Sequence, residues 1–258
     1  MIQKIKVGAV SYLNTKPLIY GFEQGMMSEE MELVFDFPSN IARKLLNDEI
    51  DIGLVPVAVL PAMQEYHIIG DCCIGCNGSV ASVCLFSDVP LDKIEKVLLD
   101  YQSRTSVALA KVLLREYWQV TPRLEDAGKD FRDHIHGATA GLVIGDRALQ
   151  QRKISPYVYD LGEAWKQFTG LSFVFAAWIS NKPLDPGFIE RFNQANKEGF
   201  GHLPEIVREN PFTDFDLYAY FTKYLDYSLD DAKRKGLESF LQYLGVKTNI
   251  EKKEYFRP

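Results

Sequence analysis

The stretch that decides the fold of this chain is Val7-Gly-Ala-Val-Ser-Tyr-Leu-Asn-Thr-Lys-Pro-Leu18. It opens with an apolar run, and a cluster of small polar side chains follows. Pro17 then stands where the first turn of a helix tolerates a missing N–H group. The stretch therefore predicts a buried strand, a polar turn and a helix N-terminus, which is a geometry that suits an anion.

Strand and helix patterns alternate through the first two-thirds of the chain, which is typical of an α/β protein with mostly parallel sheets. Apolar or alternating runs predict strands over residues 5–11, 32–37, 50–55, 67–69, 80–86, 94–99, 140–144 and 173–179. Helical patterns begin at Pro17, Ser39, Pro56 and Ser103 and after Gly145. From residue 185 to about 244 we expect helices, with breaks near Pro211 and at residues 226–228.

Two sets of strands and helices followed by a helical tail indicate two lobes. The crossovers between them are expected near residues 86–90 and 173–180. We therefore expect a discontinuous first lobe of residues 1–86 and 177–258, a second lobe of residues 87–176, and a cleft between the two.

The composition limits the partners of the chain. Its 258 residues carry a net charge of −6, and no run of Lys or Arg with interleaved aromatic residues is present, so a nucleic-acid partner is not expected. The N-terminus shows no apolar segment followed by a small-residue cleavage site, and no stretch approaches the length of a membrane span. We therefore expect a cytoplasmic protein with no membrane partner.

The cysteines and histidines give only weak metal signals. Cys73-x-x-Cys76 lacks a second such pair and a nearby His, so Cys72, Cys73, Cys76 and Cys84 are expected to be reduced structural thiols. His134-x-His136 is better explained by a solvated loop than by a metal site. No metal and no organic cofactor is indicated.

Candidate binding residues follow the predicted strands. Open α/β sheets bind ligands just beyond the carboxyl ends of their strands. The residues at these ends are Ser11, Tyr12, Asn14, Pro56, Val57, Ser103, Arg104, Thr105, Ser106, Gly145 and Asp146. Ser82 lies in the predicted strand before the crossover and could face the cleft. We expect these residues to converge between the lobes.

Each candidate also has a purely structural explanation. Ser103-Arg-Thr-Ser106 offers hydroxyl and N–H donors to a carboxylate, but from the motif alone a helix N-cap is favoured. Asn14 could orient a substrate hydroxyl or carboxylate, or it could close an Asx-turn. Asp146 is better explained as a helix cap than as a catalytic group. None of the four histidines follows a predicted strand, which argues against hydrolase-type nucleophilic catalysis.

Six short motifs occur in order along nearly the whole chain. They span residues 11–18, 51–56, 103–107, 143–146, 160–165 and 169–176. Together they resemble the chorismate dehydratases of the futalosine route to menaquinone (the MqnA family). The resemblance implies a two-lobed fold of the type 2 periplasmic-binding-protein kind with a ligand cleft between the lobes. It also implies that chorismate loses water to give 3-[(1-carboxyvinyl)oxy]benzoate.

The resemblance assigns roles to two residues. In that family an Asn of the first motif and a Ser before the crossover lie at the reacting part of the substrate, and they correspond to Asn14 and Ser82. Formation of the aromatic ring supplies much of the driving force, so positioning and polarisation are the main requirements. Asn is not basic, so we expect the enolpyruvyl carboxylate of chorismate itself to take the ring proton. Chorismate is then the small-molecule partner, while the oligomeric state is not indicated.

Two other functions remain open at this point. The sister enzyme 1,4-dihydroxy-6-naphthoate synthase shares the fold, but that family has a His-Glu pair where this chain has Gly145-Asp146. A non-catalytic solute-binding module is the second alternative. Ligand binding without turnover would favour the module.

Overall fold

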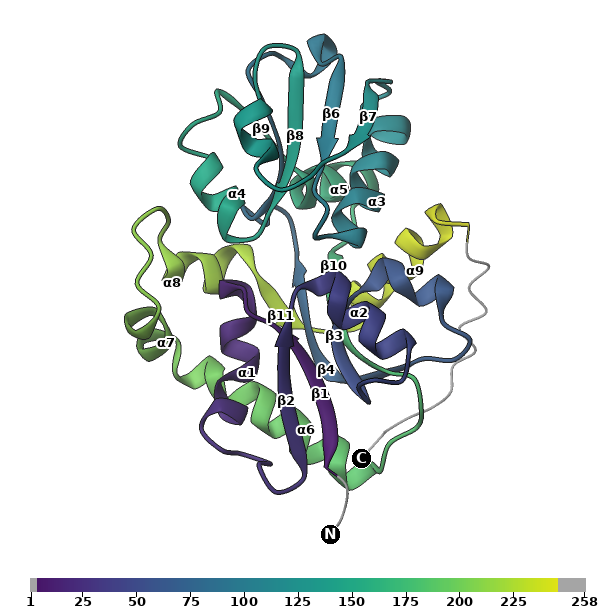
Figure 1. The fold of residues 1–258 in the computed structure, drawn as a ribbon, viewed down its shortest axis with the longest axis vertical. Helices are drawn as coiled ribbons and strands as arrows, with labels where there is room; N and C mark the ends of the chain where they lie inside the picture. Colours follow the sequence, from purple (N-terminus) through teal and green to yellow (C-terminus); the bar gives the residue numbers. More distant parts are fainter. Residues whose placement is uncertain (1–3, 246–258) are drawn as a thin grey trace.

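The computed structural model describes residues 4–245 and contains two β-sheets, which lie in separate lobes (Figure 1). The lower, six-stranded sheet has the order β11-β4-β10-β3-β1-β2. Its strands are β1 (Ile5–Val10), β2 (Met31–Asp36), β3 (Ile52–Pro56), β4 (His67–Cys76), β10 (Phe173–Ser180) and β11 (Asp226–Ser228). The upper, five-stranded sheet has the order β7-β6-β8-β5-β9. Its strands are β5 (Val83–Ser87), β6 (Lys96–Leu99), β7 (Arg123–Asp126), β8 (Thr139–Ile144) and β9 (Tyr157–Asp160).

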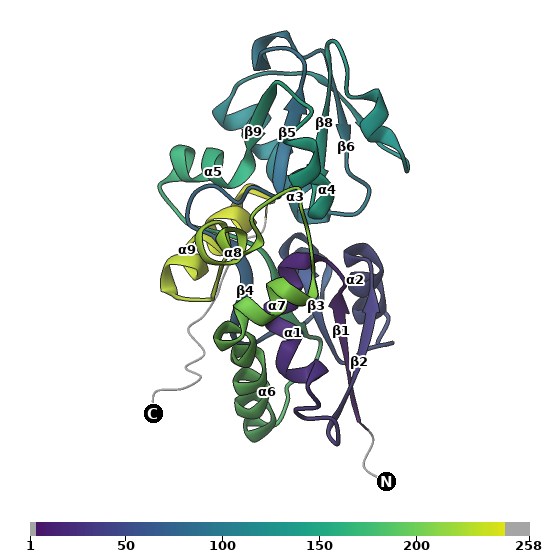
Figure 2. The same ribbon diagram turned by 90° about the vertical axis from the view of Figure 1, so that its left-hand side faces the viewer.

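Helices cover both sheets. They are α1 (Lys16–Glu23), α2 (Pro38–Leu46), α3 (Arg104–Val112), α4 (Asp146–Gln151), α5 (Leu161–Thr169), α6 (Pro186–Glu198), α7 (Leu203–Glu209), α8 (Leu217–Ala219) and α9 (Asp231–Tyr243). Short 3₁₀ helices span Leu13–Thr15, Val57–Ala62, Leu91–Lys93, Phe131–His134 and Gly199–Gly201, and π-helical turns span Leu113–Tyr117 and Tyr220–Tyr224. In the lower lobe α2 packs across β1 and β3, while α1 packs against α6 (Figure 2).

Both sheets are mixed. The parallel pairs join β1 to β2 and β3 and join β6 to β7 and β8, so the predicted parallel arrangement forms the strand-helix-strand core of each lobe. The remaining pairs, made by β4, β5, β9, β10 and β11, are antiparallel. Strands β5 and β10 each enter their sheet from the other lobe and run antiparallel to both of their neighbours.

The chain passes from one sheet to the other between β4 and β5 and returns between β9 and β10. The expected lobe boundaries at 86/87 and 176/177 therefore fall inside β5 and β10, a few residues beyond the crossings. Residues 1–3 and 246–258 of the expected first lobe lie outside the described residues.

Some predicted elements differ in the structure. Ser39 does not cap a helix, because α2 begins at Pro38 and Phe37 is its N-cap. Residues 57–62 form a 3₁₀ helix, since Pro61 has no N–H group to continue an α-helix. The strands β7, β9 and β11, only three or four residues long, were not predicted. Strand β4 runs on to Cys76 and holds three of the four cysteines, while Cys84 lies in β5.

The main apolar core runs through both lobes. Strand β5 is buried on both faces, because Val83 and Leu85 contribute to the main core while Cys84 and Phe86 pack in a smaller cluster above it. Trp165 of α5 packs edge-on against Phe240 of α9, so the C-terminal helix is held against the upper lobe (Figure 2). No helix among residues 4–245 is long and apolar enough to cross a membrane.

Candidate functional site

A cavity that is partly open to solvent lies between the lobes. The lower lobe lines it with Val10, Tyr12, Asn14, Thr15, Pro38, Leu54, Pro56, Ile74, Phe175 and Ala176. The upper lobe and the crossing segment line it with Val80, Ser82, Val83, Ser103, Ser106, Ile144 and Gly145. The carboxyl ends of β1, β3 and β8 meet here, as the strand-end argument predicts. All the lining side chains are neutral, so an anion in this cavity would be held by hydroxyl, amide and backbone N–H donors.

The start of α3 presents such donors. Ser103 is its N-cap, and its Oγ accepts a hydrogen bond from the Ser106 backbone N–H at 3.1 Å. The Ser103 hydroxyl donates to Ser106 Oγ at 2.9 Å, which leaves the Ser106 hydroxyl proton available to a ligand. N–H groups in the first turn of a helix have no carbonyl partner within it and attract anions. The two explanations of this motif are therefore compatible: Ser103 caps the helix, and Ser106 faces the cavity.

The other two residues of this motif do not line the cavity. Arg104 is exposed. Thr105 is buried, and its Oγ1 accepts a hydrogen bond from the Ala58 backbone N–H of the opposite lobe at 3.1 Å. Thr105 therefore links the lobes.

Gly145 and Asp146 connect the lobes at the other side of the cavity. Gly145 has φ 63° and ψ −148°, a conformation that only glycine adopts readily, and a Cβ atom there would lie 3.5 Å from the Tyr12 ring. Asp146 makes no side-chain cap and does not line the cavity. Its Oδ1 instead accepts a hydrogen bond from the Leu13 backbone N–H at 3.3 Å, and burial raises the pKa of its carboxyl. The predicted helix cap at Asp146 is therefore wrong.

Asn14 lies on the short 3₁₀ helix that follows β1. Its Oδ1 accepts a hydrogen bond from the Thr15 hydroxyl at 3.3 Å, and its backbone carbonyl accepts one from the Tyr227 hydroxyl at 3.0 Å. Among the described contacts it closes no Asx-turn, and its side-chain N–H₂ group has no protein acceptor. The amide is therefore free to donate to a ligand in the cavity.

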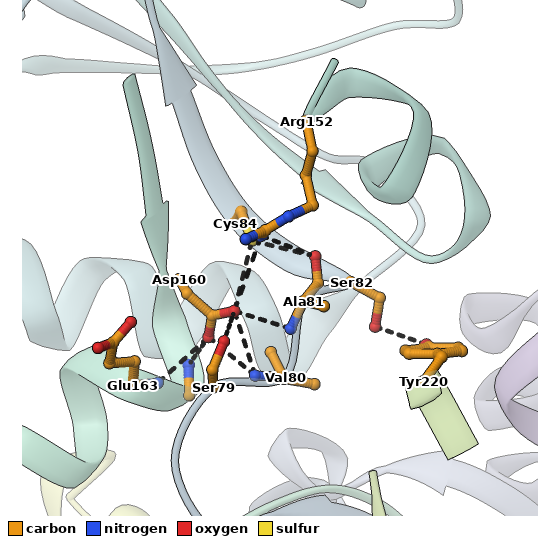
Figure 3. A network of polar contacts seen from close by, with 10 residues as sticks. Ser79, Val80, Ala81, Ser82, Cys84, Arg152, Asp160, Glu163 and Tyr220 are labelled. Atoms are coloured by element: carbon orange, nitrogen blue, oxygen red, sulfur yellow. Dashed lines mark hydrogen bonds and ion pairs between the residues drawn. The ribbon is translucent and has the colours of Figure 1, made fainter. Parts of the chain in front are cut away.

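Ser82 lies in the crossing segment just before β5, not within a strand as predicted, and only 1% of it is exposed. Its Oγ accepts a hydrogen bond from the Tyr220 hydroxyl at 2.7 Å (Figure 3). Its backbone carbonyl accepts one from Gly145 N–H at 2.8 Å. Ser82 is thus tied to the start of α4 and to the C-terminal segment.

Asp160 organises the segment that carries Ser82 (Figure 3). Its carboxylate accepts hydrogen bonds from the Ser79 hydroxyl at 2.7 Å, from Val80 N–H at 3.0 Å and from Ala81 N–H at 2.7 Å. The same carboxylate caps α5. Ala81 has φ 62°, an unfavourable conformation for a residue with a side chain, so these bonds hold a strained turn next to Ser82.

A second polar network connects the Tyr12 hydroxyl to Gln102, Arg147 and Asp100. The Tyr12 hydroxyl donates to Gln102 Oε1, which also accepts from Arg147 Nη2 at 2.7 Å. The same Arg147 nitrogen donates to Asp100 Oδ2 at 2.7 Å. Burial raises the pKa of Asp100 and Arg147 opposes this shift. The network fixes the Tyr12 ring across the two lobes.

The structure brings together seven of the predicted site residues at the cavity: Tyr12, Asn14, Pro56, Ser82, Ser103, Ser106 and Gly145. The other five do not line it. Of these, Ser11 is exposed and Val57 is buried in the main core. Sequence reasoning missed Tyr220, which carries no local signal, and Asp160, whose only signal was its place in a motif without an assigned role.

The described residues contain no group of three or more side chains suited to hold a metal ion. The four cysteines are buried free thiols, and burial raises the pKa of Cys72 to about 12. They are therefore poor nucleophiles and poor metal ligands at neutral pH.

Comparison with known sequences gives a family match. A family model described as menaquinone biosynthesis matches residues 5–245. The chain is 28% identical to the chorismate dehydratase of Thermus thermophilus, over 93% of this chain and 95% of that protein. It is 25% identical to the chorismate dehydratase of Campylobacter jejuni, over 91% of this chain and 95% of that protein.

Solved structures resemble the fold. A protein of Archaeoglobus fulgidus has a TM-score of 0.74 at 14% identity, covering 94% of this chain and 97% of that chain. A Candida albicans protein described as having the generic periplasmic binding protein fold has a TM-score of 0.61 at 14% identity, covering 95% and 90%. The periplasmic aliphatic sulphonate binding protein of Escherichia coli has a TM-score of 0.61 at 12% identity, covering 96% and 90%. These likenesses confirm the expected two-lobed fold.

Proposed function

Because this chain belongs to the menaquinone biosynthesis family, whose model matches residues 5–245, we propose that it is a lyase that dehydrates chorismate. The product is 3-[(1-carboxyvinyl)oxy]benzoate, and the reaction belongs to the futalosine route and takes place in the cytoplasm. The observation that carries the proposal is the similarity to two chorismate dehydratases over more than nine-tenths of the chain. The presence of Asn14 and Ser82 on one cavity supports it.

The C3 proton of the ring passes to the enolpyruvyl carboxylate of the substrate, the C3–H electron pair forms the C3=C4 bond, and the C4–O bond breaks. The departing hydroxyl leaves as water with one proton, and the enolpyruvyl carboxylate gives up the proton it received, so the net loss from the substrate is one water. The ring becomes aromatic, no electron acceptor is needed, and the protein contributes position and polarisation.

The cavity residues suit these tasks. We assign the free amide of Asn14 to the enolpyruvyl side chain and the hydroxyl of Ser82 to the departing C4 oxygen. The N–H groups at the start of α3, with Ser106, would receive the ring carboxylate. The apolar wall, which includes Phe175 and Ile74, offers a surface to the flat product ring.

The first test is to incubate the purified protein with chorismate alone and to follow the mixture by mass spectrometry and ultraviolet absorbance. We expect a product lighter by one water with the absorbance of a substituted benzoate, formed faster than in a control without protein. Unchanged chorismate together with thermal stabilisation would favour the solute-binding module instead. Unchanged chorismate without stabilisation would direct attention to the sister reaction.

Asn14→Ala should lower kcat about a hundredfold, since a donor aimed at the reacting group acts mainly in the transition state. Asn14 is only half-buried, so we expect the melting temperature to stay near that of the wild type. Asn47→Ala removes an exposed amide that binds Glu49 and is the matched control, expected to keep wild-type turnover. Wild-type turnover by Asn14→Ala would contradict the assignment.

A further inference from the structure

Tyr220 is a buried polar residue that does not line the cavity but contacts Ser82, which does, and no part of the proposed mechanism uses it. It begins the π-helical turn Tyr220–Tyr224, which follows α8, and its side chain is completely buried. Its hydroxyl lies 2.7 Å from Ser82 Oγ, and among the described residues Ser82 is its hydrogen-bond partner (Figure 3). A buried hydroxyl with one partner raises the question of which oxygen donates.

The burial of Tyr220 decides which of the two hydroxyls donates in the hydrogen bond between Tyr220 and Ser82. If Ser82 donated to Tyr220, the phenol proton would be buried without an acceptor, which is costly. If Tyr220 donates, its proton is satisfied and the Ser82 proton remains free. Burial raises the pKa of Tyr220 well above its usual value, so the phenol keeps its proton at neutral pH. Tyr220 is therefore the donor, and Ser82 must direct its own proton elsewhere.

The backbone around Ser82 limits where that proton can go. The Asp160 carboxylate holds the N–H groups of Val80 and Ala81, and the Ser82 carbonyl is held by Gly145 N–H. With Oγ bound to Tyr220 on one side, the remaining side of the hydroxyl faces the cavity that Ser82 lines. Among the described contacts no protein atom accepts its proton.

We propose that Tyr220 is a positioning residue that makes Ser82 a hydrogen-bond donor to an oxygen of the bound substrate. This rests on the proposed function and deepens it, because it specifies that Ser82 donates a proton rather than accepting one. The oxygen it meets is the departing C4 oxygen, on which negative charge develops as the C–O bond breaks. The hydrogen bond from Tyr220 polarises the Ser82 hydroxyl and makes it a stronger donor.

The test is a double-mutant cycle of Tyr220→Phe and Ser82→Ala, with chorismate as substrate. Tyr220→Phe removes one oxygen and keeps the ring in its place. We expect it to lower kcat about tenfold and to leave KM nearly unchanged, because the effect acts on the transition state. In the Ser82→Ala background, Tyr220→Phe should have no further effect on kcat, since the hydroxyl through which it acts is missing.

Tyr224→Phe is the matched control. Tyr224 lies on the same turn, its ring packs against Phe215, and it does not line the cavity. We expect it to keep the wild-type kcat. Melting curves of all variants exclude unfolding as the cause of a loss.

The outcomes separate the inference from the function on which it rests. Suppose that the wild type is active and that Tyr220→Phe lowers kcat by the same factor in the wild-type and Ser82→Ala backgrounds. That result would overturn the inference, because Tyr220 would then not act through the Ser82 hydroxyl. A rise in KM with unchanged kcat would overturn it too. A wild type that does not convert chorismate would overturn the proposed function, and the inference with it.

Discussion

At the scale of single residues, Gly162 allows the segment that carries Ser82 to pack closely against α5, because glycine has no side chain. Gly162 lies in the first turn of α5, beside Asp160. A Cβ atom at Gly162 would lie 2.5 Å from the Gly78 carbonyl oxygen and 2.6 Å from Cys76 Sγ. Strand β4 and the crossing segment therefore approach α5 as closely as they do because residue 162 has no side chain.

Gly162→Ala should lower the free energy of unfolding by about 2 kcal/mol, since overpacking a buried contact forces backbone to move. The melting temperature, followed by circular dichroism, should fall by about 4–8 °C. Gly128→Ala is the matched control, because nothing lies within 4 Å of a Cβ atom there. If Gly162→Ala has the melting temperature of the wild type, the segment can shift without a loss of folding free energy.

At the scale of elements, the turn from β2 into α2 is held by polar contacts of Asp36. Asp36 ends β2, and its carboxylate accepts hydrogen bonds from Phe37 N–H and Asn40 Nδ2, both at 2.8 Å. Lys44, one helical turn further along α2, lies 2.8 Å from the other carboxylate oxygen. Hydrogen bonds from Lys44 and Asn40 lower the pKa of Asp36 to about 2. The carboxylate thus joins the strand to the helix.

This junction makes a pH-dependent contribution to stability. The pKa of Asp36 is lower in the folded chain than its usual value of 3.8, so the contribution is complete above about pH 4 and is lost as the pH falls toward 2. After allowance for solvent screening we expect Asp36→Asn to cost about 1 kcal/mol at pH 7. The difference in melting temperature from the wild type should shrink below pH 4.

The exposed Asp92, whose side chain is 69% exposed, provides the control. Asp92→Asn should have the melting temperature of the wild type at every pH tested. A difference for Asp36→Asn that stays constant between pH 7 and pH 3 would show that the Asp36 charge does not contribute.

At the scale of the whole molecule, the lobes are linked by contacts around the cavity as well as by the two crossings. The Leu13 N–H donates to Asp146, and the Ala58 N–H donates to Thr105. The Tyr12 hydroxyl donates to Gln102. Each bond joins a backbone group or ring of the lower lobe to a side chain of the upper lobe, so together they favour a narrow cleft.

Removing two of these links should widen the cleft. We expect the double variant Asp146→Ala and Thr105→Val to show a larger radius of gyration in small-angle scattering without ligand, and chorismate to reduce it again. Its KM for chorismate should rise about tenfold, because part of the binding energy is used to bring the lobes together.

Arg43→Ala, which breaks an ion pair with Glu49 inside the lower lobe, is the control and should scatter like the wild type. If the double variant has the wild-type radius of gyration and KM, these contacts do not control the cleft.

Local patterns determined much of the fold. The apolar run of β1, the N-cap at Ser103 and the buried run of β8 each follow from residues that are neighbours in sequence, because capping and periodicity act within a few residues. The strand-end argument predicted six of the residues that line the cavity, and Ser82, predicted from its place before the crossover, lines it too. Local capping patterns assigned wrong roles to Ser39 and Asp146, because α2 begins one residue before Ser39 and the Asp146 carboxylate binds the Leu13 N–H of the other lobe.

The sequence by itself therefore determined the two sets of strands and helices, the family and the residues of the candidate site that meet at one cavity. Only the tertiary structure decided how Ser82 is held. Its partner Tyr220 is 138 residues away along the chain, and Asp160 lies about 80 residues from the N–H groups that it binds. No local pattern specifies such pairs, because they form only when β9 and the segment around Tyr220 both pack against the crossing between the lobes.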